Sequence, residues 1–135
     1  MTNGERADRL FAEAQAVAEE LSGALARGRW NLAARRAQEV VELVVKALLN
    51  EMGTEYPRVH DVVPTFADTV RQRGLDVDSA FLDWLHGFSS RLSEIRGPAF
   101  YHEIGVAEAE ARAAVDGAAR VLAFGLDFVA RLRAR

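Results

Sequence analysis

The chain has 135 residues, of which 50% are hydrophobic and 27% are charged. This length and balance predict one globular domain over residues 1–135, with a single buried core. The sequence contains no cysteine, which excludes disulfides and thiolate metal sites and fits a cytoplasmic protein. The net charge of −3 argues against a strongly basic protein that coats nucleic acid nonspecifically.

The sequence pattern shows no membrane or secretory signal. The longest apolar run, VVELVVKALL, carries Glu42 and Lys46 and is shorter than the roughly 18 residues that span a bilayer. The N-terminal stretch MTNGERADRL lacks the apolar segment of a secretory signal. We therefore expect a cytoplasmic protein with no membrane association.

Two long helices are predicted in the first half of the chain. From about residue 5 to residue 26, apolar residues recur at three- and four-residue intervals, and Gly28 then marks a break. A second stripe, from about 29 to 52, is wider, so this helix should be the most buried. Its valines would also suit a strand, but its length, its alanines and the Glu42–Lys46 pair at four-residue spacing favour a helix.

A loop and three further helices are predicted after residue 52. Gly53 is placed to end the second helix, and Asp61 to cap a short third one with Pro64 in its first turn. The expected ranges are about 62–73, 76–96 and 106–133. No stretch favours a strand, so the expected fold is all-α: an up-and-down helical bundle of four long helices plus one short helix.

Two parts of the chain resemble the HEPN domain family. The second helix and its loop carry the family's pattern of an Ala/Gln start, Glu and Lys four apart, Ala-Leu-Leu, a glycine loop and a His-Asp pair. The matching residues are Ala37, Gln38, Glu42, Lys46, Ala47, Leu48, Leu49, Gly53, Pro57, His60 and Asp61. The segment before the last helix matches through Arg96, Pro98, Ala99, Phe100 and Tyr101, with His102 where glycine is usual.

The resemblance implies an all-α, HEPN-like bundle that forms a homodimer. It also implies membership of one of three groups. Some relatives are metal-independent endoribonucleases of toxin and defence systems, some are non-catalytic partners of small nucleotidyltransferases, and many have no assigned activity. The catalytic group is marked by an Arg and a His separated by four to six residues, and here five residues separate Arg96 from His102.

Arg96 and His102 are the candidate catalytic residues. Cleaving RNA without a metal requires a group that removes the 2′-OH proton, and an imidazole titrates near neutral pH. A fixed guanidinium would stabilise charge on the phosphorane oxygens, and Tyr101 would stack on a base. The alternative is that Gly97-Pro98 only breaks the helix, with an incidental histidine and with aromatic side chains that plug the end of the bundle.

Arginine dominates the basic residues, with sixteen arginines and one lysine. Arg29, Arg35 and Arg36 lie in a stretch without acidic residues, from 21 to 38, and are candidates for contacts with the phosphates of RNA or a nucleotide. The alternatives are ordinary solvated helix arginines and an arginine excess that reflects a GC-rich genome.

The other histidines favour structural roles. Adjacent residues rarely point at each other, so we expect Asp61 to cap a helix and His60 to order the loop. His86 is expected at the boundary of an apolar stripe. No histidine pair has metal-ligand spacing and no glycine-rich phosphate loop is present, so we expect no metal and no cofactor.

Three hypotheses follow for the function. The first is a non-catalytic module that binds a nucleotide, RNA or a small nucleotidyltransferase partner in a toxin–antitoxin or defence-type system. The second is a metal-independent endoribonuclease toxin that uses Arg96 and His102. The third is an interaction protein with no nucleic-acid role.

Overall fold

The computed structural model describes residues 1–97 and 105–135, apart from the side chain of Arg96. These residues form helices and connecting loops and contain no strand, which confirms the predicted all-α class. The helices are α1 (Asn3–Glu19), α2 (Leu21–Ala26), α3 (Trp30–Glu51), α4 (Val63–Gln72), α5 (Ser79–Arg96) and α6 (Glu108–Arg133). No helix in this part of the chain is long and apolar enough to cross a membrane.

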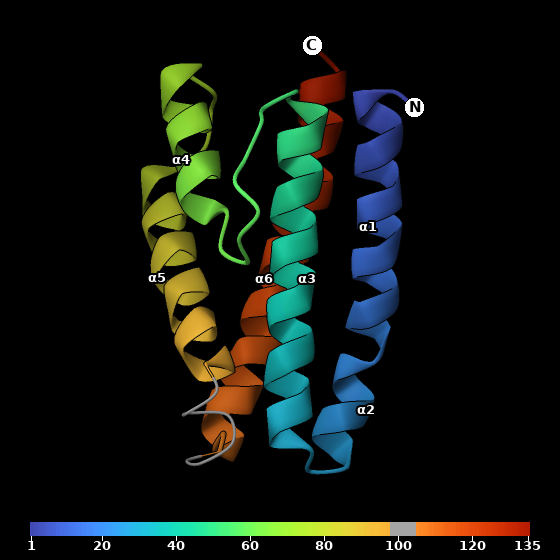
Figure 1. Cartoon of the computed structure of the whole chain (residues 1–135), viewed down its shortest axis with the longest axis vertical. Coiled ribbons are helices and arrows are strands. Elements are labelled where there is room, and N and C mark those ends of the chain that lie inside the picture. The colour runs from blue at the N-terminus through green and yellow to red at the C-terminus, as the bar shows by residue number, and fades with distance from the viewer. Residues whose placement is uncertain (98–104) are drawn as a thin grey trace.

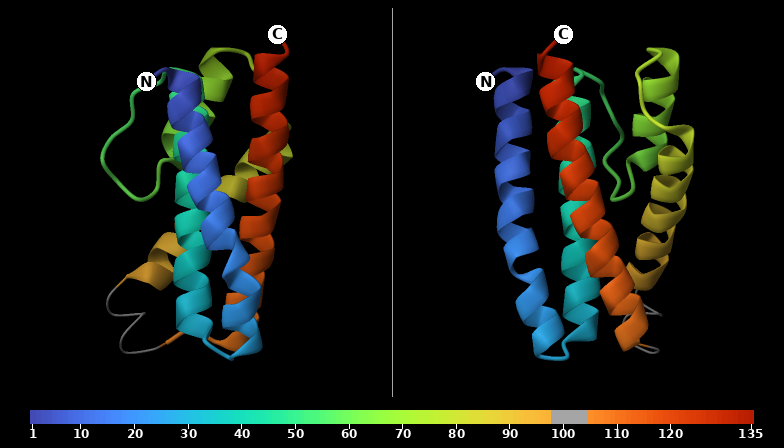
Figure 2. Two further views of the ribbon diagram at one scale, coloured as in Figure 1. Left: turned by 90° about the vertical axis from the view of Figure 1, so that its right-hand side faces the viewer. Right: turned by 180° about the vertical axis from the view of Figure 1, so that it is seen from behind.

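The helices run up and down around α3 (Figure 1). Helices α1 and α6 pack along α3, while α4 and α5 form a second layer on its other side. The loop over residues 53–62 descends between α3 and the α4–α5 pair, as both Figure 1 and Figure 2 show. Both ends of the chain lie at the same end of the bundle (Figure 2).

The predicted first helix is divided into α1 and α2. The amide of Glu20 donates to the carbonyl of Val17, three residues earlier, at 3.0 Å. This tighter turn ends α1, and α2 begins at the next residue. Together α1 and α2 occupy the place of one long helix, so the bundle of four long helices and one short helix (α4) is confirmed.

Helix α3 is the core of the bundle, as its wide apolar stripe predicted. Half of its residues are buried, and they contact helices on both sides. It lies between Gly28 and Gly53, whose φ angles are +66° and +67°. This left-handed conformation strains any residue with a Cβ, so glycine sets both limits of the helix.

The start of α4 differs by one residue from the prediction. Val62, not Asp61, immediately precedes the helix. Asp61 still supplies the side-chain bond expected of it, since its Oδ1 accepts from the amide of Val63 at 3.1 Å. The same oxygen accepts from the hydroxyl of buried Ser89 on α5 at 2.8 Å, which ties the loop to α5.

The two layers are packed against α6 in different ways. Gly125 lets α6 approach α3 closely, because a Cβ there would lie 2.5 Å from Val44 Cγ1 and 3.1 Å from Phe11 Cε1. On the other side, aromatic rings fill the space between α6 and the α4–α5 layer. The rings belong to Phe66, Phe81, Trp84, Phe88, Phe124 and Phe128.

Gly125→Ala should destabilise the fold, because the new methyl group collides with α3. Overpacking of this kind costs about 1–3 kcal/mol, against a gain of up to about 1 kcal/mol in helix propensity. Gly87→Ala on α5 is the matched control, since nothing lies within 4 Å of its added Cβ, and it should be neutral or stabilising. Urea unfolding of the two variants checks this, and equal stabilities would contradict the close approach of α3 and α6.

Candidate functional site

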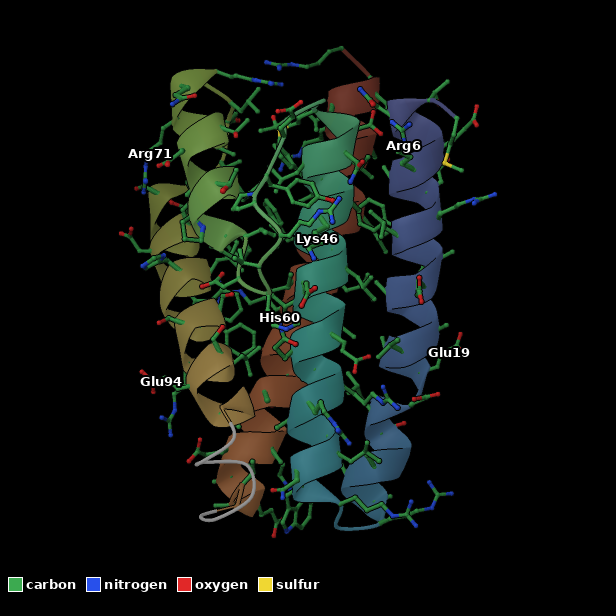
Figure 3. The ribbon with its side chains drawn as sticks, in the orientation of Figure 1. Arg6, Glu19, Lys46, His60, Arg71 and Glu94 are labelled. Atoms are coloured by element: carbon green, nitrogen blue, oxygen red, sulfur yellow. The ribbon has the colours of Figure 1, made fainter. Side chains whose placement is uncertain are left out.

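A polar stripe runs along the face of α3 that meets the 53–62 loop. Gln38, Glu42, Lys46 and Asn50 recur every fourth residue, so they lie one above another on the helix. Figure 3 shows Lys46 and His60 together on this face of α3. The stripe stands out because the rest of α3 contributes mainly alanine, valine and leucine to the core.

Glu42 is at the centre of the stripe and is hydrogen-bonded on both oxygens. Its Oε2 accepts from Lys46 Nζ at 2.8 Å. Its Oε1 accepts from Gln38 Nε2 at 3.1 Å and lies 2.9 Å from His60 Nδ1, which donates when it carries a proton. We call these four residues, Gln38, Glu42, Lys46 and His60, the Glu42 cluster.

The Glu42 carboxyl is held in its ionised form. Only 17% of its side chain is exposed, and this burial by itself raises the pKa of the carboxyl. Hydrogen bonds from Lys46, Gln38 and His60, together with the charge of Lys46, outweigh burial, so the pKa of Glu42 lies below its ordinary value. At neutral pH Glu42 is therefore a fixed negative charge that orients its neighbours.

His60 is the most exposed member of the cluster. Its side chain is 63% exposed, and among the described residues only Glu42 hydrogen-bonds its ring. Glu42 holds Nδ1, and the Asp61–Ser89 bond holds the neighbouring backbone.

The stripe continues upward through Asn50. Its side-chain amide donates to the carbonyl of Lys46 at 2.9 Å and to the hydroxyl of Tyr56 at 3.0 Å. Lys46 Nζ lies 6.0 Å from the centre of the Tyr56 ring. These bonds attach the upper half of the loop to α3, as the Glu42 cluster attaches the lower half.

The candidate catalytic pair falls at the end of α5. Arg96 is the last residue of that helix, and its position lies two turns beyond Ser89 on the same helical face. His102 and the predicted base-stacking residue Tyr101 lie outside the described residues.

The predicted arginine patch is divided between different surroundings. Arg29 is exposed just before α3, and Arg35 is exposed in its second turn. Arg36 pairs with Glu39 at 2.9 Å, and its Nε lies 3.6 Å from Glu20 at the α1–α2 junction. The stretch that is free of acids in the sequence is thus not free of acids in space.

His86 is exposed on α5, and its side chain has no hydrogen bond or ion pair to another described residue. Asp61 bonds Val63 and Ser89, and His60 bonds Glu42, so the adjacent pair makes no dyad of its own. Among the described side chains, no three His, Asp or Glu residues converge in a way that could hold a metal ion.

The fold and the polar site define an all-helical bundle with a charged cluster on its central helix. The family model of the HEPN domain matches residues 7–128. The match covers most of the chain, so the protein belongs to the HEPN domain family. No curated protein and no solved structure matches the chain.

The His60–Glu42 contact joins residues that are 18 positions apart, and sequence reasoning did not pair them. His60 was expected to order the loop, but its hydrogen-bond partner Glu42 was not predicted. The four-residue spacing of the polar stripe could have revealed this contact. Half-buried polar side chains need hydrogen-bond partners, and the loop that contains His60 follows the helix in the sequence.

Glu42→Gln should destabilise the protein by about 1.5–3 kcal/mol at pH 7, because it removes charge-assisted hydrogen bonds in a half-buried place. A carboxyl whose pKa is lowered by folding stabilises the protein above its unfolded pKa of about 4.3. That contribution is lost as the pH falls through the folded pKa, so the difference from the wild type should shrink towards pH 3. Urea unfolding at pH 7 and pH 3 measures it.

Glu19→Gln is the control for this substitution. Glu19 is exposed on α1 and has no ion pair within the described residues, so its loss should change stability little at either pH. A deficit in Glu42→Gln that is as large at pH 3 as at pH 7 would contradict the ionised state of Glu42.

Proposed function

We propose that this protein is a HEPN binding module that recognises the phosphates of a nucleotide or of RNA at the Glu42 cluster. The observation that carries the proposal is the arrangement of His60 and Lys46 around one ionised carboxylate. Glu42 fixes both. Lys46 Nζ retains N–H donors that it does not share with Glu42, and the second ring nitrogen of His60 donates in the protonated form of the ring. Groups of this kind contact phosphate oxygens in nucleic-acid sites.

The energetics of α3 support a functional role for the cluster. Half-burying an ion pair costs desolvation, and apolar residues of similar size are often as stable or more so. The core face of α3 uses such apolar residues throughout. A polar stripe on the opposite face is therefore more readily explained by binding than by stability.

The residues just before α6 contact the start of α3. The amide of Val106 donates to Asn31 Oδ1, near the start of α3, at 2.7 Å, and α5 ends at Arg96. Val106 therefore lies beside the first turn of α3, which is close in sequence to Arg29 and Arg35. We propose that Arg29 and Arg35 extend the phosphate-binding surface there, and that the protein acts as a homodimer with a small nucleotidyltransferase partner in a toxin–antitoxin or defence-type system.

His60→Ala should weaken binding of a fluorescent single-stranded RNA about tenfold, because one donor to phosphate is lost. Fluorescence anisotropy at low salt measures the affinity. His86→Ala is the matched control, an exposed histidine on α5, and should bind like the wild type. If the wild type binds neither RNA nor nucleoside phosphates, or if the two variants lose the same affinity, the proposal for the Glu42 cluster fails.

A second candidate function is favoured by Arg96, which ends α5 and is separated from His102 by five residues. An endoribonuclease would use His102 to transfer the proton and Arg96 to stabilise the developing charge. In that case the Glu42 cluster would bind the substrate beside the reacting phosphate.

If Arg96 and His102 are catalytic, the protein should cleave total RNA in the presence of EDTA. His102→Ala and Arg96→Ala should abolish cleavage, and both should relieve any growth arrest on expression in bacteria, while His86→Ala should behave like the wild type. RNA that binds to the wild-type protein but stays intact would exclude the enzyme and leave the binding module.

A further inference from the structure

At the end of the bundle that carries both termini, the first turns of α1 and the upper half of the 53–62 loop enclose an open pocket of about 680 Å³. Volumes of roughly 300–1,000 Å³ are usual for sites that bind small molecules. Its lining includes Asn3, Arg6, Asn50, Thr54, Tyr56 and Arg58. We propose that this pocket is a second site, separate from the Glu42 cluster, which binds the phosphate group of a nucleotide-sized ligand.

The charges of the lining favour an anion. Arg6 and Arg58 are both exposed, and neither has an ion pair among the described residues. Glu55 is the one acidic residue of the lining. The pocket is therefore net positive on a chain whose net charge is −3, and two guanidinium groups suit the fork geometry of phosphate oxygens.

The arginines around the pocket have two distinct roles. Arg73 donates to the carbonyl of Met52 at 2.7 Å and to the hydroxyl of Thr54 at 3.0 Å. Arg133 pairs with Asp8 at 2.9 Å and with Glu51 at 2.6 Å, which holds α6 to α1 and α3. These two arginines build the frame. Arg6 and Arg58 line the pocket, and within the described part of the chain neither forms an ion pair, although Arg6 donates to Asn3 Oδ1 at 3.5 Å.

The polar groups of the lining are also held in place. Asn50 donates both to Lys46 and to Tyr56, so the Tyr56 hydroxyl accepts one bond and keeps its own proton to donate. Gly53 brings the loop close to α1, since a Cβ there would lie 3.1 Å from Asn3 Nδ2. The lining therefore offers amide and hydroxyl groups, and an aromatic ring, beside the two cations. Figure 3 places Arg6 on α1 at this end of the molecule, above Lys46.

Several sources of phosphate share this chemistry: inorganic phosphate, a free nucleotide and the 5′ end of RNA. Isothermal titration calorimetry at low salt compares inorganic phosphate, AMP, adenosine, and one RNA oligonucleotide with and without a 5′-phosphate. We expect AMP to bind and adenosine to bind at least about tenfold more weakly, because charge-assisted bonds to the phosphate are missing. If the 5′-phosphorylated RNA binds more tightly than AMP, the ligand is the end of an RNA. If inorganic phosphate binds as tightly as AMP, the ligand is a free anion.

The variants locate the site. Arg6→Ala and Arg58→Ala should each weaken AMP binding at this pocket about tenfold, and the double variant should abolish binding at this pocket. Arg9→Ala, one turn further along α1 and absent from the lining, is the matched control and should bind like the wild type. Thermal unfolding verifies that all of these surface variants remain folded.

Three results would overturn the proposal: no binding of any phosphate by the wild type, adenosine binding as tightly as AMP, or Arg9→Ala losing as much affinity as Arg6→Ala. His60→Ala separates this pocket from the Glu42 cluster, because His60→Ala and Arg6→Ala remove different components of AMP binding if both sites are occupied. If His60→Ala abolishes AMP binding while Arg6→Ala and Arg58→Ala leave it unchanged, the phosphate binds at the Glu42 cluster and not here.

Discussion

The structure depends on the double role of α3, which is the core of the bundle on one face and carries a half-buried ionised carboxylate on the other. A carboxylate that is mostly removed from water must receive hydrogen bonds or lose its charge. Glu42 receives them from Gln38 and Lys46 on its own helix and from His60 on the loop. The loop is thus a structural partner of the helix, because one of the donors that Glu42 needs comes from it.

This requirement explains the spacing of the two layers. Helices α1 and α6 pack directly on α3, and at Gly125 no side chain separates α6 from Val44. The α4–α5 layer lies further out, with stacked aromatic rings between it and α6 and the 53–62 loop between it and α3. Asp61 then binds Ser89 of α5 while His60 binds Glu42 of α3. The space that a tighter bundle would close is occupied by the residues that form the polar site.

The sequence was sufficient for the helices and insufficient for the contacts between them. Periodicity located α3, α5 and α6, and the glycines with positive φ at 28 and 53 mark the breaks that the sequence had already indicated. The division of the first helix at Glu20 was missed, since no glycine or proline marks it. Likewise the pairing of Arg36 with Glu20 and Glu39 joins residues whose distance depends on how α2 packs against α3.

The site shows the same limit more sharply. The Glu42–Lys46 pair was predicted because both residues lie on one helix, where four-residue spacing alone brings them together. His60 and the pocket residues Arg6 and Arg58 come from the loop and from α1, and their position depends on the tertiary packing. Asn50 and Tyr56 connect the Glu42 cluster to the pocket. The Asn50 amide donates to the backbone carbonyl of Lys46 and to the hydroxyl of Tyr56, which lines the pocket. A ligand that ordered the loop at one region would therefore act on groups that line the other, so the polar face of α3 and its loop form one continuous surface that joins the two proposed phosphate sites.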